Sequence, residues 1–464
     1  MKTSNRCGAG DWAEILLLAL LLLCFLQSLT DFVAGIYALG LIEIRFPPEV
    51  ACVVLLLAPA ALLIPRSISA RCLVLIGELM LLSRLASLVL ETRGRMLAAG
   101  FATAAFLVLF PGLLARFDNR CGRGDRCDLS LALALTTLVS VFLGSIDSGN
   151  AIIGFGARRL LDGLLAIAAV MLLWSWGWAR VETDAPALAT RGALGGWRIV
   201  GQCLGTMGVP AILCLGVAVP AVTARWTEGG HLAITAMTAG AAALFVAVSV
   251  WAPGLLARLG PRALAAWNLL FLSALGVALW SSRIAFPSES GAYPFPEPPI
   301  GFPGRLGLYL MLLLSPILCV NFGRCAGALA AAAPSMRMLG FGFTLGGLWL
   351  LLLVLGQVFT TAYDYVPVVG PWFRDRFWLV QLVAGLGAVL PALLAPVRVG
   401  EAGPGSMSGA VGLPIVAAVA LALGSLAAVA YTQARPGLHS SGAPVRLMTF
   451  NLQQGYSAAG SRNF

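Results

Sequence analysis

The 464-residue sequence has very little charge and almost no histidine. Asp, Glu, Lys and Arg together make up 11% of the residues, there are two His, and 59% of the residues are hydrophobic. Soluble domains usually carry about 25% charged residues, so this composition excludes a water-soluble globule and a disordered chain. The formal net charge of +10 is scattered through short polar segments, which also excludes a nucleic-acid-binding protein.

What the sequence does have is long apolar runs. A helix needs about 20 mostly apolar residues to cross the hydrocarbon core of a bilayer. Thirteen segments qualify, the second of them being short: 15–41, 50–64, 72–90, 96–115, 129–146, 160–179, 199–224, 232–252, 263–282, 308–329, 342–363, 377–395 and 411–432. We therefore expect an all-α polytopic membrane protein with about thirteen transmembrane helices.

The distribution of Lys and Arg predicts how these spans are oriented. Cytoplasmic loops tend to hold more Lys and Arg than loops on the other side. If the N-terminus is cytoplasmic, the cytoplasmic segments hold a small excess, most of which comes from one loop that carries Arg116, Arg120, Arg123 and Arg126. The odd number of spans then places the C-terminal tail outside the cytoplasm.

A polar stretch at 180–198 divides the first twelve spans into two sets of six. Residues 58–66 are similar to residues 252–262, at corresponding places in the two sets. This pattern resembles the parallel repeat of major facilitator transporters, although the loop Asp of that family is missing from both copies. The other interpretation is that Ala, Pro, Leu and Arg are simply common at helix ends in this composition. The predicted units are a first six-helix half at 1–179, a cytoplasmic linker at 180–198, a second six-helix half at 199–395, a linker with the thirteenth helix at 396–432, and an extracytoplasmic tail at 433–464.

Few ionisable residues lie within the predicted spans. Asp31, Glu78 and Arg84 are therefore a candidate intramembrane polar site, either a proton or headgroup site or simply residues that bond one helix to another. Glu78 and Arg84 are about 600° apart around one helix and do not share a face, so they cannot pair with each other and each is expected to pair with another span. Arg158 and Asp162 are four residues apart and can pair with each other.

Neither His nor Cys offers a complete catalytic or metal site. His231 and His439 lie in predicted loops or tails, so nothing supports proton coupling through His. Most of the ten Cys lie alone within spans, where they behave as small hydrophobes. Cys121 and Cys127 share a polar loop, but zinc needs four ligands and the arginines of that loop predict a cytoplasmic location.

The character of the chain changes after the last span. In the segment 446–456, apolar residues run into Asn451 and then into polar residues and Gly, which is typical of a strand that ends in a functional loop. The segment resembles the first strand of the endonuclease/exonuclease/phosphatase superfamily, a metal-dependent phosphoesterase fold. The resemblance implies that Asn451 helps to hold a divalent metal.

The residues Asn451-Leu-Gln-Gln-Gly455-Tyr456, followed by Gly460 and Arg462-Asn463-Phe464, are more specifically similar to a membrane-linked branch of that superfamily. This branch includes the cell-wall-biogenesis family involved in remodelling glycosylphosphatidylinositol lipid. The loops at 31–49 and 365–378 are similar to the many-span part of bacterial relatives. The resemblance thus implies an integral protein of a bacterial inner (plasma) membrane.

The sequence departs from the superfamily after this strand. The metal-binding Glu and the catalytic Asp and His residues of the family lie further downstream, and one Asn cannot supply the near-octahedral oxygen ligands that Mg²⁺ requires. We therefore expect no complete catalytic site, no cofactor and no activity in residues 1–464. The resemblance implies Mg²⁺ or another divalent metal for the complete catalytic domain.

The leading hypothesis is the membrane anchor region of a protein of this superfamily, truncated at the first strand of its catalytic domain and involved in lipid or glycolipid processing. Its expected partners are membrane lipids and the missing C-terminal domain, without nucleic acid. The alternatives are a transporter of small molecules or lipids with twelve helices plus one, and a structural scaffold that binds partners.

Overall fold

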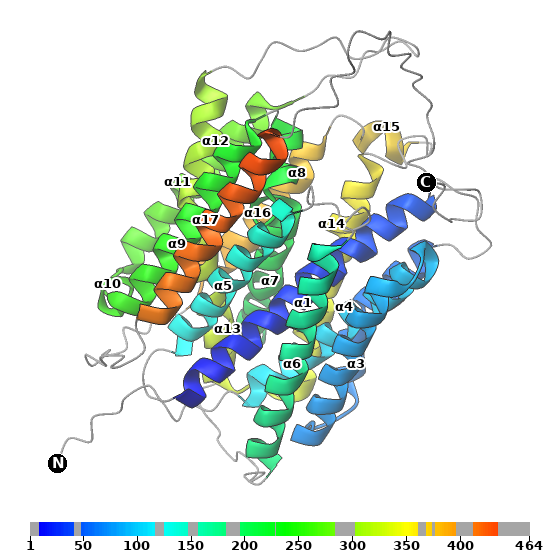
Figure 1. Ribbon diagram of the computed structural model, residues 1–464. Helices are drawn as coiled ribbons and strands as arrows, with labels where there is room; N and C mark the ends of the chain where they lie inside the picture. Colours follow the sequence, from blue (N-terminus) through cyan, green and yellow to red (C-terminus); the bar gives the residue numbers. More distant parts are fainter. Residues whose placement is uncertain are drawn as a thin grey trace, which may run out of the picture.

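The computed structural model in Figure 1 describes ten stretches of the chain: 9–40, 48–116, 125–146, 156–181, 195–227, 229–283, 302–360, 368–373, 376–395 and 412–434. Within these stretches the regular structure is entirely helical and includes no β-strand. The predicted class, an all-α polytopic membrane protein, is confirmed.

The described part of the chain is divided among helices of very different length. Their bounds are α1 (Ala9–Gly40), α2 (Pro48–Leu56), the 3₁₀-helix η1 (Ala58–Leu63), α3 (Ala70–Val89), α4 (Thr92–Arg116), α5 (Asp125–Ile146), α6 (Ala157–Val181), α7 (Gly196–Ile212), the π-helical turn η2 (Leu213–Val217), α8 (Pro220–Thr227), α9 (His231–Trp251), α10 (Pro253–Ala257), α11 (Pro261–Ser281), α12 (Phe302–Leu314), α13 (Pro316–Ala332), α14 (Met336–Phe359), α15 (Val369–Phe373), α16 (Phe377–Leu393) and α17 (Gly412–Ala434).

Ten of the described helices are long and apolar enough to cross a membrane: α1, α3, α4, α5, α6, α7 with η2, α9, α11, α14 and α17. Helices α12 and α13 form a further, broken span with a bend of 42°. Pro316 begins α13 at this break, and a proline bends a helix because it lacks the backbone N–H. Two shorter apolar helices, Val50–Leu63 and Phe377–Leu393, account for the remaining predicted segments.

Contacts between neighbouring helices show that successive segments run in alternate directions. Gly35 of α1 lies against Met96 of α4, and Gly100 of α4 lies against Phe32 of α1, so these two helices are antiparallel. Helices α3 and α6 are antiparallel in the same way. We call the two ends of the bundle the Ala9 end and the Gly40 end, after the first and last residues of α1.

The short second segment also passes between these two ends. Leu55 of α2 contacts Gly100 near the Gly40 end. At the Ala9 end, the side chain of Arg116 donates a hydrogen bond from Nη2 to the carbonyl oxygen of Ile68 at 2.7 Å. The chain from α2 to Ile68 therefore crosses the bundle, although its helices are too short to do so alone.

Alternation continues through the second half of the chain. Gly208 and Gly205 of α7 lie against Gly387 and Pro391 of α16, which makes α7 and α16 antiparallel. Figure 1 shows α17 (orange) running the same way as α1 (blue), and α17 packs against α5 and α9. Ala434, at the end of α17, consequently lies at the Gly40 end.

Stacked phenylalanines mark the centre of the bundle. Phe25 of α1 stacks on Phe106 of α4 with ring centroids 4.2 Å apart, and Phe106 stacks on Phe110 at 5.3 Å. Phe110 in turn contacts Phe322 of α13 and Phe343 of α14. Helices α1 and α4 are thus central, and their side chains are mostly buried.

One face of α6 points away from the bundle. Leu160, Leu164, Ile167, Met171 and Trp174 recur every three or four residues and are all exposed. Residues at this spacing form one continuous strip along a helix. A strip of large apolar side chains fits contact with lipid tails, because in water it would drive aggregation.

Two glycines allow helices to approach very closely. A Cβ atom at Gly208 would lie 2.6 Å from the carbonyl group of Gly387, and a Cβ atom at Gly347 of α14 would overlap the carbonyl oxygen of Leu56. Small residues commonly occupy such crossings between membrane helices. Only glycine fits these two contacts without a shift of the backbone.

Helices from the two predicted halves share many of their contacts. Helix α5 packs against α9, α13 and α17 as well as α1, and α14 packs against η1 and α4. In Figure 1, α3 and α6 lie on one side of the bundle and α11 and α12 on the other. The division into two six-helix halves stays a prediction.

Candidate functional site

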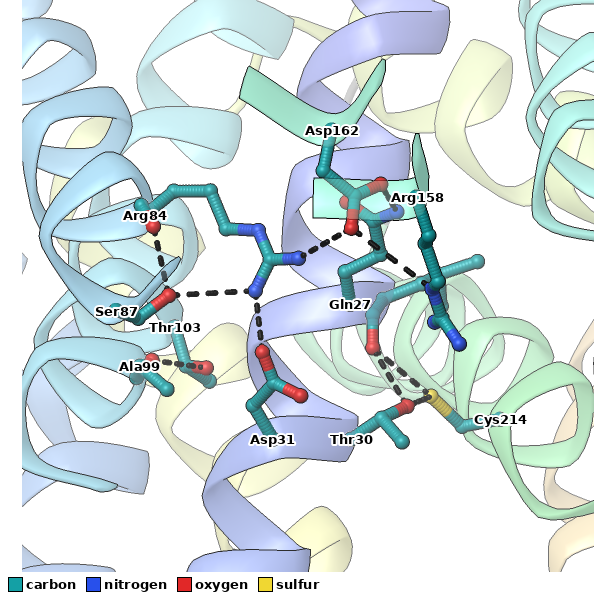
Figure 2. Close-up of polar contacts among 11 residues, drawn as sticks. Gln27, Thr30, Asp31, Arg84, Ser87, Ala99, Thr103, Arg158, Asp162 and Cys214 are labelled. Atoms are coloured by element: carbon teal, nitrogen blue, oxygen red, sulfur yellow. Dashed lines mark hydrogen bonds and ion pairs between the residues drawn. The ribbon is translucent and has the colours of Figure 1, made fainter. Parts of the chain in front are cut away.

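A cluster of charged side chains lies buried between α1, α3 and α6 (Figure 2). Asp31, Arg84 and Asp162 come one from each helix and are 4%, 1% and 5% exposed. Arg84 donates from Nη1 to Asp31 Oδ2 and from Nη2 to Asp162 Oδ2, the latter at 3.4 Å. One guanidinium therefore holds two carboxylates, which offsets part of the cost of removing three charges from water.

Neighbours on the same helices complete the cluster. Gln27 donates from Nε2 to Asp162 Oδ1 at 2.7 Å, and Arg84 Nη1 also donates to Ser87 Oγ at 3.3 Å. Arg158 Nε lies 3.9 Å from Asp162 Oδ2. Each of these neighbours is three or four residues from a member of the cluster, which is the spacing that places two side chains on one face of a helix.

The cluster forms the inner part of a pocket near the Gly40 end. The pocket is narrow and partly open to solvent, and Asp31, Arg84, Arg158 and Asp162 line its buried part. Arg95 of α4 and Arg159 of α6 also line it and are partly exposed, so they form its rim. The pocket therefore connects a buried ion-pair network to the end of the bundle at which α4 and α6 begin.

The three residues predicted as an intramembrane polar site do not all meet. Asp31 and Arg84 are paired directly, whereas Glu78 accepts a hydrogen bond from Trp174 Nε1 at 2.5 Å. Glu78 lies six residues before Arg84 on α3, which is about 9 Å along the helix axis. Each of the two α3 residues pairs with another span, as their angular separation predicts.

Asp162 is the member that sequence reasoning did not place in the site. Its spacing from Arg158 predicted a local pair, and the two do lie within ion-pair distance. The alternating direction of the spans could have placed Asp162 in the site. It brings the ends of the first and third spans and the start of the sixth to the same side of the membrane. Asp31, Arg84 and Asp162 each lie close to that side.

A second buried polar pair joins α11 to α13. Asn321 donates from Nδ2 to Asn268 Oδ1 at 2.7 Å and to the carbonyl oxygen of Ala388 in α16 at 3.3 Å. Asn268 donates from Nδ2 to Asn321 Oδ1 at 3.3 Å and to the carbonyl oxygen of Leu264 at 3.0 Å. Every side-chain polar atom of the pair thus has a partner.

Thr30 links the same region of α1 to the second half of the chain. Its Oγ1 donates to the carbonyl oxygen of Leu26 at 2.8 Å and lies 3.5 Å from Cys214 Sγ in η2. Figure 2 shows this contact one turn from Gln27 on the same helix. The turn of α1 that follows Gln27 therefore contacts η2, the turn that follows α7.

The described residues hold no group of three or more His, Cys, Asp or Glu side chains that could bind a metal ion. No disulfide joins the Cys residues whose side chains are described, from Cys24 to Cys325. Cys121 and the predicted metal ligand Asn451 lie outside the described residues, as does the tail at 435–464. The predicted metal site stays a prediction.

Comparison with known proteins finds no family model that matches the chain and no curated protein that matches it. The resemblance to the phosphoesterase superfamily therefore depends on the residues of the tail and of the loops at 31–49 and 365–378 alone.

Proposed function

We propose that the chain is the membrane-embedded region of a phosphoesterase-related protein that acts on lipid or glycolipid substrates. The observation that supports this proposal most is the direction of α17. Because α17 runs the same way as α1, the segment that contains the Asn451 motif begins at the Gly40 end, where the charged pocket opens. A catalytic domain that followed this motif would begin on the face that carries the pocket.

In this proposal the bundle has two tasks. It anchors the following domain at one membrane surface, and it holds substrate lipids beside that domain. Positive side chains at the Gly40 end suit the second task, since arginine N–H groups form charge-assisted hydrogen bonds to phosphate oxygens. The proposed face is extracytoplasmic, as the Lys and Arg distribution predicts.

Reporter fusions test the orientation. We expect alkaline phosphatase, which is active only outside the bacterial cytoplasm, to be active when fused after Ala434 and inactive when fused after Arg116 at the Ala9 end. A green fluorescent protein at the same two sites should give the opposite pattern. Active phosphatase at Arg116 and inactive phosphatase at Ala434 would contradict the proposed orientation.

The coding DNA tests the assignment to a phosphoesterase. We expect the codons that follow Phe464, in one of the three frames, to encode a metal-binding Glu and later Asp and His motifs. A downstream sequence without these motifs would remove the reason for proposing a catalytic domain.

A transporter is the second candidate, and the broken span favours it. Discontinuous helices form substrate sites in many transporters, and α12 and α13 are bent by 42° where they meet. However, Pro316 by itself accounts for a bend, and the two pockets near α1 are lined only by residues of the first predicted half. Uptake of a labelled lipid or solute by proteoliposomes that is abolished when Asn321 is replaced by Leu would favour transport.

A further inference from the structure

Three arginines of the Gly40-end pocket have buried N–H groups without a hydrogen-bond partner in the described part of the chain. These atoms are Arg84 Nε, Arg95 Nε and Arg158 Nη1. The side chains of Arg84 and Arg158 are 2% and 10% exposed, so water reaches them poorly. Because an unpaired donor on a buried charged group is costly, the pocket lacks acceptors that a ligand would supply.

Arginine side chains from two further helices face the same pocket. Arg95 of α4 and Arg158 of α6 line it together with Arg84, Asp31 and Asp162. Guanidinium groups keep their positive charge, and charges in a place of low dielectric interact strongly, so the pocket suits a ligand that carries negative charge.

We propose that this pocket binds the phosphate group of a phosphate ester that also carries a hydroxyl group. Arginine N–H groups form charge-assisted hydrogen bonds to phosphate oxygens, and their planar fork matches the geometry of a phosphate. Asp31 and Asp162 hold the Arg84 guanidinium in place. Arg95 and Arg158 approach from α4 and α6 and bind the phosphate directly.

The hydrogen-bonding requirement of the Asp31 carboxylate favours a ligand with a hydroxyl group. Its Oδ1 atom is buried and has no hydrogen-bond partner among the residues that the structure describes, while Oδ2 accepts from Arg84. A carboxylate oxygen accepts hydrogen bonds only, so a hydroxyl group of a ligand would satisfy it. The glycerol or sugar of a lipid headgroup carries such a donor, and so does a soluble sugar phosphate.

The test uses the full chain purified in a neutral detergent. Short-chain phosphatidylglycerol, which carries a phosphate, hydroxyl groups and no positive charge, is titrated against short-chain phosphatidylcholine and against glycerol 3-phosphate. The readouts are the number of bound molecules by native mass spectrometry and the rise in the thermal unfolding midpoint, because a ligand that binds only the folded state stabilises it. We expect phosphatidylglycerol to bind at least about tenfold more tightly than phosphatidylcholine, whose ammonium group the arginines repel.

Arg95→Gln and Arg158→Gln should each weaken phosphatidylglycerol binding about tenfold, as loss of a charge-assisted hydrogen bond predicts. Arg93→Gln is the matched control, since Arg93 is exposed on the same turn of α4 and does not line the pocket. Arg95 takes no part in the ion pairs of the cluster, so its variant should fold. In the Arg158→Gln variant, the new amide group retains a donor for Asp162.

Phosphatidylglycerol and glycerol 3-phosphate distinguish a lipid headgroup from a soluble phosphate ester as the ligand. Tight binding of phosphatidylglycerol but not of glycerol 3-phosphate identifies a lipid headgroup, and the reverse identifies a soluble ester. Equal binding by the wild type, the Arg95 and Arg158 variants and the Arg93 control would overturn the proposal. The described residues that line the pocket come from α1, α3, α4 and α6, so the test does not depend on the role of the Asn451 motif.

Discussion

The Asn268–Asn321 pair and the Asp31–Arg84–Asp162 cluster are both buried between helices, but they meet their hydrogen-bonding requirements differently. All side-chain polar atoms of the two asparagines have partners within the bundle. In the charged cluster, Arg84 Nε and Asp31 Oδ1 have none, and a pocket opens beside them. A polar contact that satisfies itself joins helices, whereas one that leaves buried groups unpaired is a candidate for binding a ligand.

The largest effect in this comparison is expected from Arg84→Met. The variant leaves Asp31 and Asp162 buried without the cation that joins them, and removing one partner of a buried ion pair typically costs about 3–5 kcal/mol. The measurement is the free energy of unfolding in mixed micelles titrated with sodium dodecyl sulfate.

Arg93→Met is the control for Arg84→Met, because it removes an exposed arginine near the same end of the bundle. We expect its unfolding free energy to match that of the wild type within the error of the measurement. If Arg84→Met also matched the wild type, the ion pairs would contribute nothing to stability.

A smaller effect is expected from the asparagine pair. In a double-mutant cycle with Asn268→Ala and Asn321→Ala, we expect a coupling energy of about 0.6 kcal/mol and no more than about 1.7 kcal/mol, the range found for hydrogen bonds between membrane helices. The four unfolding free energies are measured under the same micelle conditions. A coupling energy close to that lost in Arg84→Met would remove the distinction between the two clusters.

The smallest effect is expected from Glu78→Gln. The amide oxygen that this substitution introduces can still accept from Trp174 Nε1, and Glu78 is only partly buried, so the change in unfolding free energy should stay within about 0.5 kcal/mol. Phosphatidylglycerol binding should also be unchanged. Loss of that binding would show that the charge of Glu78 belongs to the pocket.

Several features of the fold were predictable because they depend on local composition. All thirteen predicted segments contain helices, including the short segment 50–64. The length of segment 50–64 alone did not predict how this part of the chain crosses the bundle. The crossing requires the non-helical residues up to Ile68, whose carbonyl oxygen is held by Arg116.

The candidate site was predictable only in part. Asp31 and Arg84 stood out because ionisable residues are rare in apolar spans. Asp162 did not, since Arg158 offered a nearer partner. Arg95 lies in the first turn of a helix, where an arginine at the water boundary is common, so nothing in the sequence distinguished it from Arg93.

The sequence by itself determined the class of the protein, because a chain with thirteen apolar runs and 11% charged residues can bury its surface only in a membrane. It also set which side chains share a face of each helix, through the 3.6-residue period. Only the tertiary structure decided which faces meet. The rotation and depth of each helix depend on packing against several neighbours at once, so the tertiary structure brought Asp162 and Arg95 to Arg84 and placed Glu78 beside Trp174 instead.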